Sequence, residues 1–437
     1  MQKLLTKTAR RYILMVDKEK GWFGAMLLQF SCENHKSIKD RITFSTIAGK
    51  DTAYESDLKS FGNMNVVRMA AIYGANGSGK SNVISAIDFM RALVVNSINH
   101  QPGEGVFQAP HKLADPEMPS SYDIQFVTKG IRYAYGFSVK NHLIEEEYLY
   151  YFPKKRQVKI FERKNLEIKP GDRYKNAFEL SMNVLKDNRL FLSCAANYTN
   201  LKEVEDAFLF FKDDIVVYNP VANNWSEYSA KLLQDNAQIK KLYIDILNVL
   251  GTNVKDVKVK FETKKLTHAD LPGDMPEFLK DMISSQESNL VEAKMVYEDF
   301  EINMQEESTG IQKLFEIICP ILDILMKGRI LICDEIETGL HEAVVKRILE
   351  IFQGNKKDEF AQIIFSTHDT SLLSSVPFRR DQIWFTELDE QRSTDLFSLA
   401  EIKNVRKEEN LARGYINGKY GAIPMLNSSF SNLFHDE

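Results

Sequence analysis

Short apolar runs alternate along the chain with segments whose apolar residues recur at helical spacing. Residues 66–73 are mostly apolar and residues 330–333 wholly so, as expected of strands buried on both faces of a sheet. Residues 122–139 predict a hairpin whose turn is Lys129-Gly130. A helix is predicted over 81–95, where the apolar stripe consists of Val83, Ile87, Met90 and Val94. Such alternation predicts an α/β fold.

The middle of the chain changes character. A helix is expected over 239–250, with Gly251 as its C-cap. Alternating apolar residues and lysines predict a strand over 254–261. The polar residues 275–293 predict a mobile loop with a short helix. These elements are therefore expected to form a region distinct from the α/β part.

Composition and charge narrow the possible classes of protein by exclusion. The chain has 437 residues, of which 44% are apolar and 27% charged, ordinary values for a folded protein. Its 56 Lys and Arg against 61 Asp and Glu give a net charge of −5, whereas a protein that coats nucleic acid over its whole surface is usually basic. No run approaches about 18 apolar residues, which excludes a membrane-spanning helix.

The cysteines and the N-terminal residues indicate in which cellular compartment the protein is expected. The four cysteines lie far apart without any CxxC pair, at Cys32, Cys194, Cys319 and Cys333. Their simplest interpretation is four buried thiols in a reducing cytoplasm. Charged residues at 17–20 interrupt any apolar core of a signal peptide. We therefore expect a cytoplasmic protein.

The clearest motif follows the apolar run that ends at Tyr73. Residues Gly74-Ala75-Asn76-Gly77-Ser78-Gly79-Lys80-Ser81 match GxxxxGK[ST]. Glycines let backbone N–H groups surround phosphate oxygens, Lys80 would neutralise the β- and γ-phosphates, and the Ser81 hydroxyl would bind Mg²⁺. The helix that begins near Ser81 adds its positive end. The motif predicts binding of ATP with Mg²⁺.

A second motif is the apolar run 330–333, which ends in Asp334-Glu335. The carboxyl end of such a strand is where an α/β sheet places its ligand. Asp334 would hold Mg²⁺, directly or through water, and Glu335 would orient or deprotonate the attacking water. Taken alone, the pair could equally be an ordinary surface turn; together with the phosphate loop it predicts a catalytic metal site.

Two further segments lie on either side of the acidic strand. Ser308-Thr309-Gly310 comes at the start of a predicted helix, and is either an anion site or a plain N-cap. His368 follows the apolar run 362–366, so it would end the strand next to the acidic one and could contact the γ-phosphate. A lone histidine, however, is more often structural.

The distance between the two main motifs predicts the domain organisation. Lys80 and Asp334 are 254 positions apart, far more than in a minimal phosphate-loop domain, so a large insertion should divide one nucleotide-binding domain. We expect five parts: an N-terminal arm or misplaced start at 1–25, an N-terminal lobe at 26–140, an inserted β and helical region at 141–295 that serves as lid, dimer or partner surface, a C-terminal lobe at 296–400, and a tail at 401–437.

The order of these motifs resembles the ABC-type ATPases, in particular their SMC/RecF/RecN-like branch. More narrowly, the chain is similar to a bacterial "AAA family ATPase" group that includes the ATPases of abortive-infection AbiL/RloB-type loci and the AriA subunit of PARIS defence. The segments that carry this resemblance begin at Met26, Ala71, Asn188, Glu307 and Gly414. It implies an α/β P-loop NTPase of ABC-ATPase type, with a mixed sheet, an antiparallel β part and an inserted, mainly helical lid region.

The resemblance also implies roles for particular residues. In ABC-type ATPases two nucleotide domains sandwich two ATP molecules, and the signature of one subunit closes on the γ-phosphate held by the other. Ser308 and Gly310 match the signature, although the usual LSGGQ is here Glu-Ser-Thr-Gly-Ile-Gln. His368 matches the switch histidine, and Lys36 the basic residue placed near the nucleotide. Gln125 is a candidate for the Q-loop on its identity alone.

Two basic runs leave nucleic-acid binding open. The first, at 154–164, follows Tyr148, Tyr150, Tyr151 and Phe152; the second comprises the lysines of 255–265. Basic residues beside aromatics can bind nucleic acid through phosphates and stacking. The other interpretation is the solvated face of a strand, which the alternation at 254–261 favours.

Three functions compete on this evidence. The first is the ATP-binding and ATP-hydrolysing subunit of a prokaryotic antiviral, abortive-infection-like system, a head-to-head dimer or higher homo-oligomer that controls a separate effector, by resemblance a Toprim- or RloB-like nuclease. The second is a RecF/SMC-like repair or recombination ATPase acting on DNA. The third is a nucleotide-gated scaffold. Only 102 residues follow Glu335 and they contain no Asp-x-Asp, so the chain is not expected to carry a fused Toprim nuclease.

Overall fold

The computed structural model divides the chain into two compact units. It describes residues 24–220, 222–265, 267, 275–277, 280, 287–354, 360–406 and 409–423. The smaller unit is formed by Pro220–Met326 and Thr338–Val344, and the larger by residues 24–219, 327–337 and 345–423. The predicted arm, apart from residues 24 and 25, and the end of the predicted tail lie outside the described residues. The five-part organisation stays a prediction.

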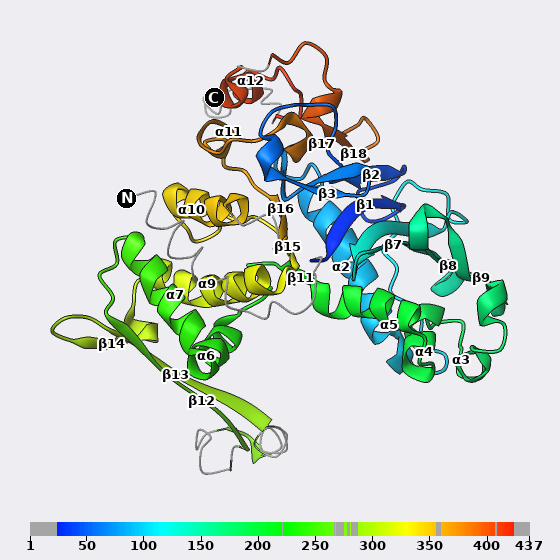
Figure 1. Cartoon of the computed structure of the whole chain (residues 1–437), viewed down its shortest axis with the longest axis horizontal. Helices are drawn as coiled ribbons and strands as arrows, with labels where there is room; N and C mark the ends of the chain where they lie inside the picture. The colour runs from blue at the N-terminus through cyan, green and yellow to red at the C-terminus, as the bar shows by residue number, and fades with distance from the viewer. Residues whose placement is uncertain are drawn as a thin grey trace, which may run out of the picture. The chain divides into compact units, whose positions relative to one another are not determined.

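A six-stranded mixed sheet forms the centre of the larger unit (Figure 1). Its strand order is β11-β15-β16-β5-β17-β18; neighbouring strands are parallel except β18, which pairs antiparallel with β17. The strands are β5 (Met69–Gly74), β11 (Ile215–Tyr218), β15 (Ile330–Cys333), β16 (Gln362–Ser366), β17 (Ile383–Leu388) and β18 (Thr394–Ser398). Every residue of β5, β15 and β16 is buried, which explains why these strands are almost wholly apolar apart from Gln362 and Ser366 at the two ends of β16.

The run at 66–73, predicted as one strand, is two. β4 (Met64–Val67) pairs with β3 (Leu58–Phe61), and only β5 enters the central sheet. The break falls at Arg68, whose guanidinium lies over the ring of Phe360. A charged side chain in an otherwise apolar run was the available signal for this interruption.

A seven-stranded antiparallel sheet makes up the other β part of the larger unit, in the order β10-β9-β8-β7-β6-β1-β2. Its strands are β1 (Met26–Glu33), β2 (Ile42–Ser45), β6 (Ser120–Thr128), β7 (Ile131–Lys140), β8 (Leu143–Tyr151), β9 (Val158–Lys164) and β10 (Glu167–Pro170). The predicted hairpin is confirmed as β6 and β7. Lys129 and Gly130 both have positive φ, 50° and 74°, as a two-residue type I′ turn requires.

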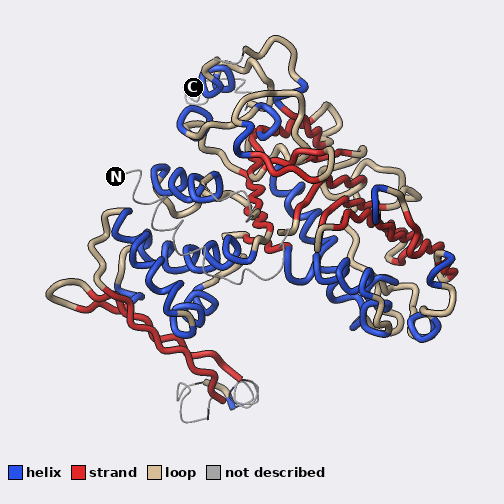
Figure 2. The backbone as a smooth tube through the Cα atoms, viewed as in Figure 1, coloured by secondary structure: helices blue, strands red, loops and turns tan. Residues whose placement is uncertain are grey.

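The helix predicted over 81–95 is confirmed as α2 (Lys80–Asn96), one of the blue helices among the red strands of the larger unit in Figure 2. One hydrophobic core joins both sheets to α2. The apolar stripe of α2 lies in this core with Ile72 of β5, Ile364 of β16 and Phe126 of β6. The remaining helices of the larger unit are α3 (Glu179–Asn183), α4 (Phe191–Tyr198), α5 (Lys202–Leu209), α10 (Glu342–Gln353), α11 (Leu372–Ser375) and α12 (Leu411–Ile416); α10 begins in the smaller unit. The start of α2, which directly follows the phosphate loop, is therefore anchored in this core.

In its described residues, the smaller unit combines the helices α6, α7 and α9 with a three-stranded antiparallel sheet. Its elements are α6 (Ser226–Asp235), α7 (Ala237–Val249), β12 (Asp256–Lys265), β13 (Glu287–Val296), β14 (Glu301–Asn303) and α9 (Thr309–Lys327). The helix over 239–250 and the strand over 254–261 are confirmed as α7 and β12. The loop predicted for 275–293 is wrong from residue 287, because β12 supplies a strand partner that local composition does not reveal.

Helix α9 continues through Pro320, which has no N–H to donate to the carbonyl of Glu316. That carbonyl accepts a hydrogen bond from Ser229 Oγ of α6 at 2.8 Å instead. The buried acceptor is satisfied from a neighbouring helix, so the proline does not end the helix.

Two expectations from composition can be compared directly with the described residues. All four cysteines are buried and unbridged, as predicted. No helix in the described ranges is both long enough and apolar enough to cross a membrane.

Candidate functional site

The phosphate loop joins the carboxyl end of β5 to the start of α2. Gly79 is the N-cap of α2 and has a φ of 106°, a backbone conformation that residues with a side chain rarely adopt. A Cβ at Gly79 would lie 2.0 Å from Thr394 Oγ1, so the close approach of β18 also requires glycine there. Gly79 offers no side chain to cap the helix, and the first N–H groups of a helix have no partner within it. This geometry suits an anion.

Lys80 is buried beside the loop that precedes it. Its Nζ donates to the carbonyls of Gly74 at 2.8 Å and Ala75 at 3.1 Å. Burial lowers the pKa of Lys80 to about 8, and the carboxylates of Glu335, Asp334 and Glu337 oppose that shift. The ammonium group thus belongs to the same electrostatic site as the acidic residues that follow β15.

The structure brings the acidic pair to the phosphate loop across β16, which lies between β15 and β5. Ser81 Oγ donates to Asp334 Oδ1 at 3.1 Å. The same carboxylate oxygen accepts a hydrogen bond from Ser366 Oγ at 2.5 Å. Asp334 is 7% exposed, so its orientation is set by these two hydroxyls rather than by water.

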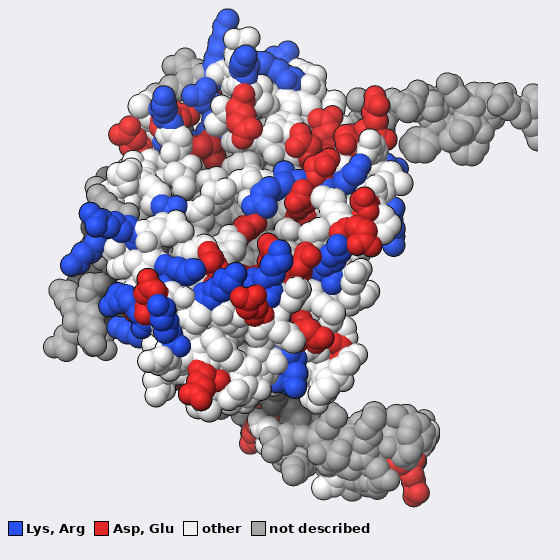
Figure 3. Space-filling view, turned by 90° about the vertical axis from the view of Figure 1, so that its right-hand side faces the viewer, with Lys and Arg blue, Asp and Glu red and all other residues white. Residues whose placement is uncertain are grey.

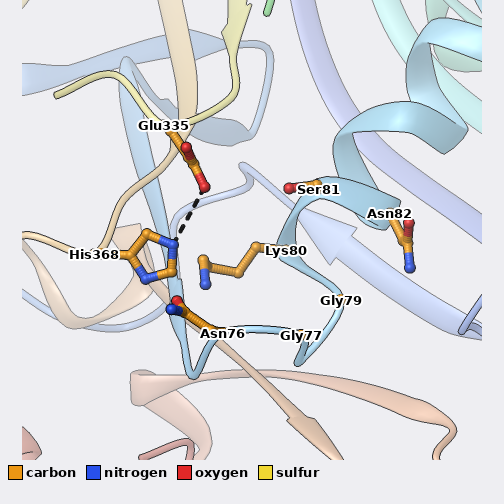
Figure 4. Close-up of a pocket in the computed structure, with 8 residues that line it drawn as sticks. All are labelled: Asn76, Gly77, Gly79, Lys80, Ser81, Asn82, Glu335 and His368. Atoms are coloured by element: carbon orange, nitrogen blue, oxygen red, sulfur yellow. Dashed lines mark ion pairs between the residues drawn. The ribbon is translucent and has the colours of Figure 1, made fainter. Parts of the chain in front are cut away.

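Glu335 and His368 lie next to each other on one side of the pocket (Figure 4). His368 Nε2 lies 3.4 Å from Glu335 Oε1, and both side chains are partly exposed. Glu335 has a φ of 46°, an uncommon value for a non-glycine residue that costs energy unless its surroundings hold it. The backbone N–H of His368 donates to Glu337 Oε1 at 2.6 Å, so the turn after β16 is tied to the turn after β15.

A pocket of about 680 Å³ lies between these groups. It is lined by Asn76, Gly77, Gly79, Lys80, Ser81, Asn82, Glu335 and His368. Its volume is in the range of small-molecule sites. Within the described residues, no three His, Cys, Asp or Glu side chains could enclose a metal ion by themselves. The adjacent oxygens of Ser81 and Asp334 fit Mg²⁺, which usually takes one or two protein ligands and completes its shell with water and phosphate oxygens.

Three hydroxyl groups that sequence reasoning missed support the phosphate loop. Thr386 Oγ1 of β17 is 2.6 Å from Ser78 Oγ, and Thr394 Oγ1 of β18 donates to the Ser78 carbonyl at 3.0 Å. Ser37 Oγ in turn lies 2.6 Å from Thr394 Oγ1 and accepts a hydrogen bond from Asn82 Nδ2, also at 2.6 Å. No sequence signal pointed to these residues, because they are far from the loop along the chain.

Lys36 does not line the pocket. It lies in the turn after β1, with a φ of 51°, and its Nζ donates to Ser85 Oγ of α2 at 2.9 Å. Gln125 is on β6 of the antiparallel sheet, where its side chain bonds to Arg132 and Gln29. The structure therefore brings neither residue to the pocket, and their predicted roles stay predictions.

His35, next to Lys36, connects α2 to the antiparallel sheet. Its Nδ1 lies 2.8 Å from the Tyr122 hydroxyl and its Nε2 3.1 Å from Ser85 Oγ. Burial, and to a smaller extent the charge of Lys36, lowers the pKa of His35 to about 4. The ring is therefore neutral in the folded protein at ordinary pH.

We expect a pH-dependent stability difference between the wild type and His35→Gln. The unfolded chain takes up the histidine proton near pH 6.5 but the folded protein only near pH 4, so acid progressively disfavours the folded wild type within this window. Glutamine does not titrate, so the variant lacks this loss of stability in acid. Its deficit in unfolding free energy should shrink by about 2 kcal/mol between pH 7.5 and 4.5, measured by urea denaturation. The stability deficit of the variant should not change with pH above pH 7.5. A deficit of equal size at pH 7.5 and 4.5 would contradict a lowered pKa of His35 in the folded protein.

Ser308 and Gly310 lie in the smaller unit, at the start of α9. Ser308 is exposed, and its Oγ accepts a hydrogen bond from the N–H of Ile311 at 3.3 Å. A Cβ on Gly310 would meet nothing within 4 Å. In the single chain, Ser308 therefore acts as the N-cap of α9. The start of this helix is exposed at Ser308, so the anion-site interpretation stays open as well.

Among the side chains that the structure describes, most cations of the two basic runs are paired with carboxylates. In the first, Arg163 is fully buried against Glu147, and Lys159 and Lys164 pair with Glu162 and Glu146. In the second, the partners are Glu298 for Lys255, Glu301 for Lys258 and Glu262 for Lys260. Figure 3 likewise shows acidic and basic side chains interspersed over the visible face. The interpretation as solvated strand faces is therefore favoured, except for Arg163, which is a core residue.

The fold and the pocket define a class of protein. A mixed sheet that carries a phosphate loop and an acidic strand, next to an antiparallel sheet, is a P-loop NTPase of ABC-ATPase type, as predicted. Residues 69–374, 306 of the 437, match the family described as "AAA domain, putative AbiEii toxin, Type IV TA system". The chain belongs to this family.

Solved structures of SMC heads are similar to most of the chain, at low identity. The SMC head domain from Thermotoga maritima has 12% identity and a TM-score of 0.40, covering 85% of this chain and 98% of that one. An SmcHead bound to the C-winged helix domain of ScpA has 15% identity and a TM-score of 0.39, with 85% and 97% covered. A Smc head with an extended coiled coil is bound to the C-terminal domain of ScpA derived from Pyrococcus furiosus. It has 12% identity and a TM-score of 0.40, covering 86% of this chain and 96% of that one. No curated protein matches the chain.

Proposed function

We propose that the chain binds ATP with Mg²⁺ and hydrolyses it to ADP and phosphate. The observation that carries this proposal is the meeting of Lys80, Ser81, Asp334, Glu335 and His368 around one pocket, from three separate parts of the sequence. The match of residues 69–374 to a family described as an AAA domain supports this proposal. Gly74 to Ser81 would hold the phosphates, and Ser81 and Asp334 the metal ion.

Hydrolysis needs a water molecule activated next to the γ-phosphate. Glu335 is the proposed base: it is partly exposed, it lines the pocket, and its charge acts on Lys80. His368 would contact the γ-phosphate through the ring nitrogen that now faces Glu335. When bound, Mg²⁺ would supply charge neutralisation for the phosphates.

The proposed biological role is control of a separate effector in a prokaryotic antiviral system. The toxin–antitoxin wording of the family description agrees with an abortive-infection-like function. A separate nuclease of Toprim or RloB type is the proposed effector, by the resemblance stated above. The alternative, a repair ATPase acting on DNA, has less support because most of the candidate DNA-binding cations whose side chains the structure describes are paired with carboxylates.

The proposed active form is a dimer in which Ser308 and Gly310 of one subunit complete the site of the other. Ser308 is exposed at the start of a helix and a Cβ at Gly310 would meet nothing within 4 Å, which suits contact with an anion brought by a partner. The opposite possibility is a monomer in which Ser308 only caps α9.

A mixture of Ser308→Arg and Glu335→Gln proteins should recover ATPase activity that neither variant has alone. In a mixed dimer, one site combines the intact acidic strand of the first variant with the intact Ser308 of the second. Random mixing makes half of the dimers mixed, each with one of two sites active, so turnover should approach about a quarter of the wild type. Phosphate release over a range of mixing ratios measures this. Strictly additive, near-zero rates would argue for a monomeric enzyme.

A further inference from the structure

Ser366, the last residue of β16, contacts three consecutive residues after β15. Its Oγ donates to Asp334 Oδ1 at 2.5 Å and accepts the N–H of Glu335 at 2.8 Å. Its carbonyl accepts the N–H of Ile336 at 3.2 Å. Ser366 is fully buried, so no water competes for these bonds. One residue of the intervening strand thus holds the whole acidic turn.

The hydroxyl acts on two groups with different proposed roles. Asp334 Oδ1 is the oxygen that also bonds Ser81, so the bond from Ser366 directs that oxygen toward the metal position. The bond to the Glu335 N–H holds a residue whose φ of 46° is unfavourable. Without the hydroxyl, the Asp334 carboxylate would lose its shorter hydrogen bond and the strained turn one of its restraints.

We infer that Ser366 is a positioning residue that sets the metal carboxylate of Asp334 and the water-activating carboxylate of Glu335 relative to the phosphate loop. The inference rests on the proposed ATPase function. It is specific to the Oγ atom, because the bond between the Ser366 carbonyl and Ile336 survives any substitution of the side chain. Ser366→Ala should therefore keep the path of the chain while releasing both carboxylates.

Metal binding separates this role from a purely structural one. With a non-hydrolysable ATP analogue, Mn²⁺ affinity is measured from the electron paramagnetic resonance signal of free Mn²⁺, and nucleotide affinity from a fluorescent analogue in EDTA. Ser366→Ala should bind Mn²⁺ about 10- to 100-fold more weakly, the range seen when groups that orient metal ligands are removed. Affinity for the metal-free nucleotide should stay within about threefold, since the phosphate loop is untouched. Turnover should fall with the Mn²⁺ affinity.

The chain offers a matched control in Ser398, at the end of β18. It is also a buried serine in the same sheet, and its Oγ bonds to the Arg380 and Ile383 carbonyls and to the Ala400 N–H. Ser398→Ala should leave Mn²⁺ affinity unchanged. Ser366→Thr, which keeps the hydroxyl, should recover metal affinity to within about threefold of the wild type.

Each outcome decides the assignment. Wild-type Mn²⁺ affinity and turnover in folded Ser366→Ala would overturn it, as would an equal loss in Ser398→Ala. If Ser366→Ala does not fold, Ser366→Cys, close in size but a weak hydrogen-bonding group, takes its place with the same expectations. A wild-type chain that binds no ATP analogue would overturn the proposed ATPase function itself and this inference with it; binding by the wild type with no effect at Ser366 overturns the inference alone.

Discussion

Glu335→Gln should hydrolyse ATP on the order of 10²- to 10⁴-fold more slowly than the wild type while still binding ATP. The amide cannot accept a proton from water, but it preserves the size of the side chain at a strained backbone position. The phosphate loop and the Ser81–Asp334 contact are unchanged, so ATP should remain bound and accumulate in a dimer. Phosphate release measures the first effect and size-exclusion chromatography with ATP the second.

Glu390→Gln is the matched control, because Glu390 is an exposed residue of the turn between β17 and β18 in the same compact unit. It should turn over at the wild-type rate. Unchanged hydrolysis in Glu335→Gln would remove Glu335 from the role of general base and direct attention to Glu337, whose Oε1 holds the backbone of His368.

Lys80→Ala should abolish measurable ATP binding, a loss on the order of 10²-fold or more in affinity. Lys80 is the cation buried in the pocket, and its carbonyl partners Gly74 and Ala75 already direct its ammonium group along the phosphate loop. An alanine would leave the phosphates facing Asp334 and Glu335 without that charge. Fluorescent-nucleotide titration measures the loss.

Lys39→Ala is its control. Lys39 also donates a hydrogen bond from Nζ, at 2.5 Å to Gln391, but this contact is exposed and outside the pocket. ATP binding by the control should be unchanged. Retained binding by Lys80→Ala would count against the proposed site. In cells that carry the chain together with its effector, Lys80→Ala should also remove any protection against phage, whereas Lys39→Ala should not.

Sequence reasoning found the site where residues act locally. The phosphate loop works through its own backbone and the helix that follows it, so eight consecutive residues were sufficient to predict it. The acidic strand and the strand before His368 were recognisable because both are buried on both faces and end in polar residues. Their adjacency followed from the rule that parallel strands present their carboxyl ends at one edge of the sheet.

The contacts that hold these motifs in place could not be found in the same way. Thr386, Thr394 and Ser37 reach the phosphate loop from positions distant along the chain, through single hydroxyl groups. Hydroxyl residues occur throughout the sequence, and nothing in their immediate neighbours marks these three. Arg163 was misplaced for a related reason: a run of cations looks solvent-exposed until Glu147, directly opposite on the neighbouring strand β8, is seen to pair with Arg163 inside the protein.

By itself, the sequence determined the class of fold, the phosphate loop and the order in which its partner motifs follow, since each depends on residue type and local spacing. Only the tertiary structure decided that β16 lies between β15 and β5, that Ser366 therefore contacts both carboxylates, and that Lys36 lies outside the pocket. The physical reason is that strand order and hydrogen-bond partners across a sheet depend on how distant segments pack together, which no single stretch of the chain encodes.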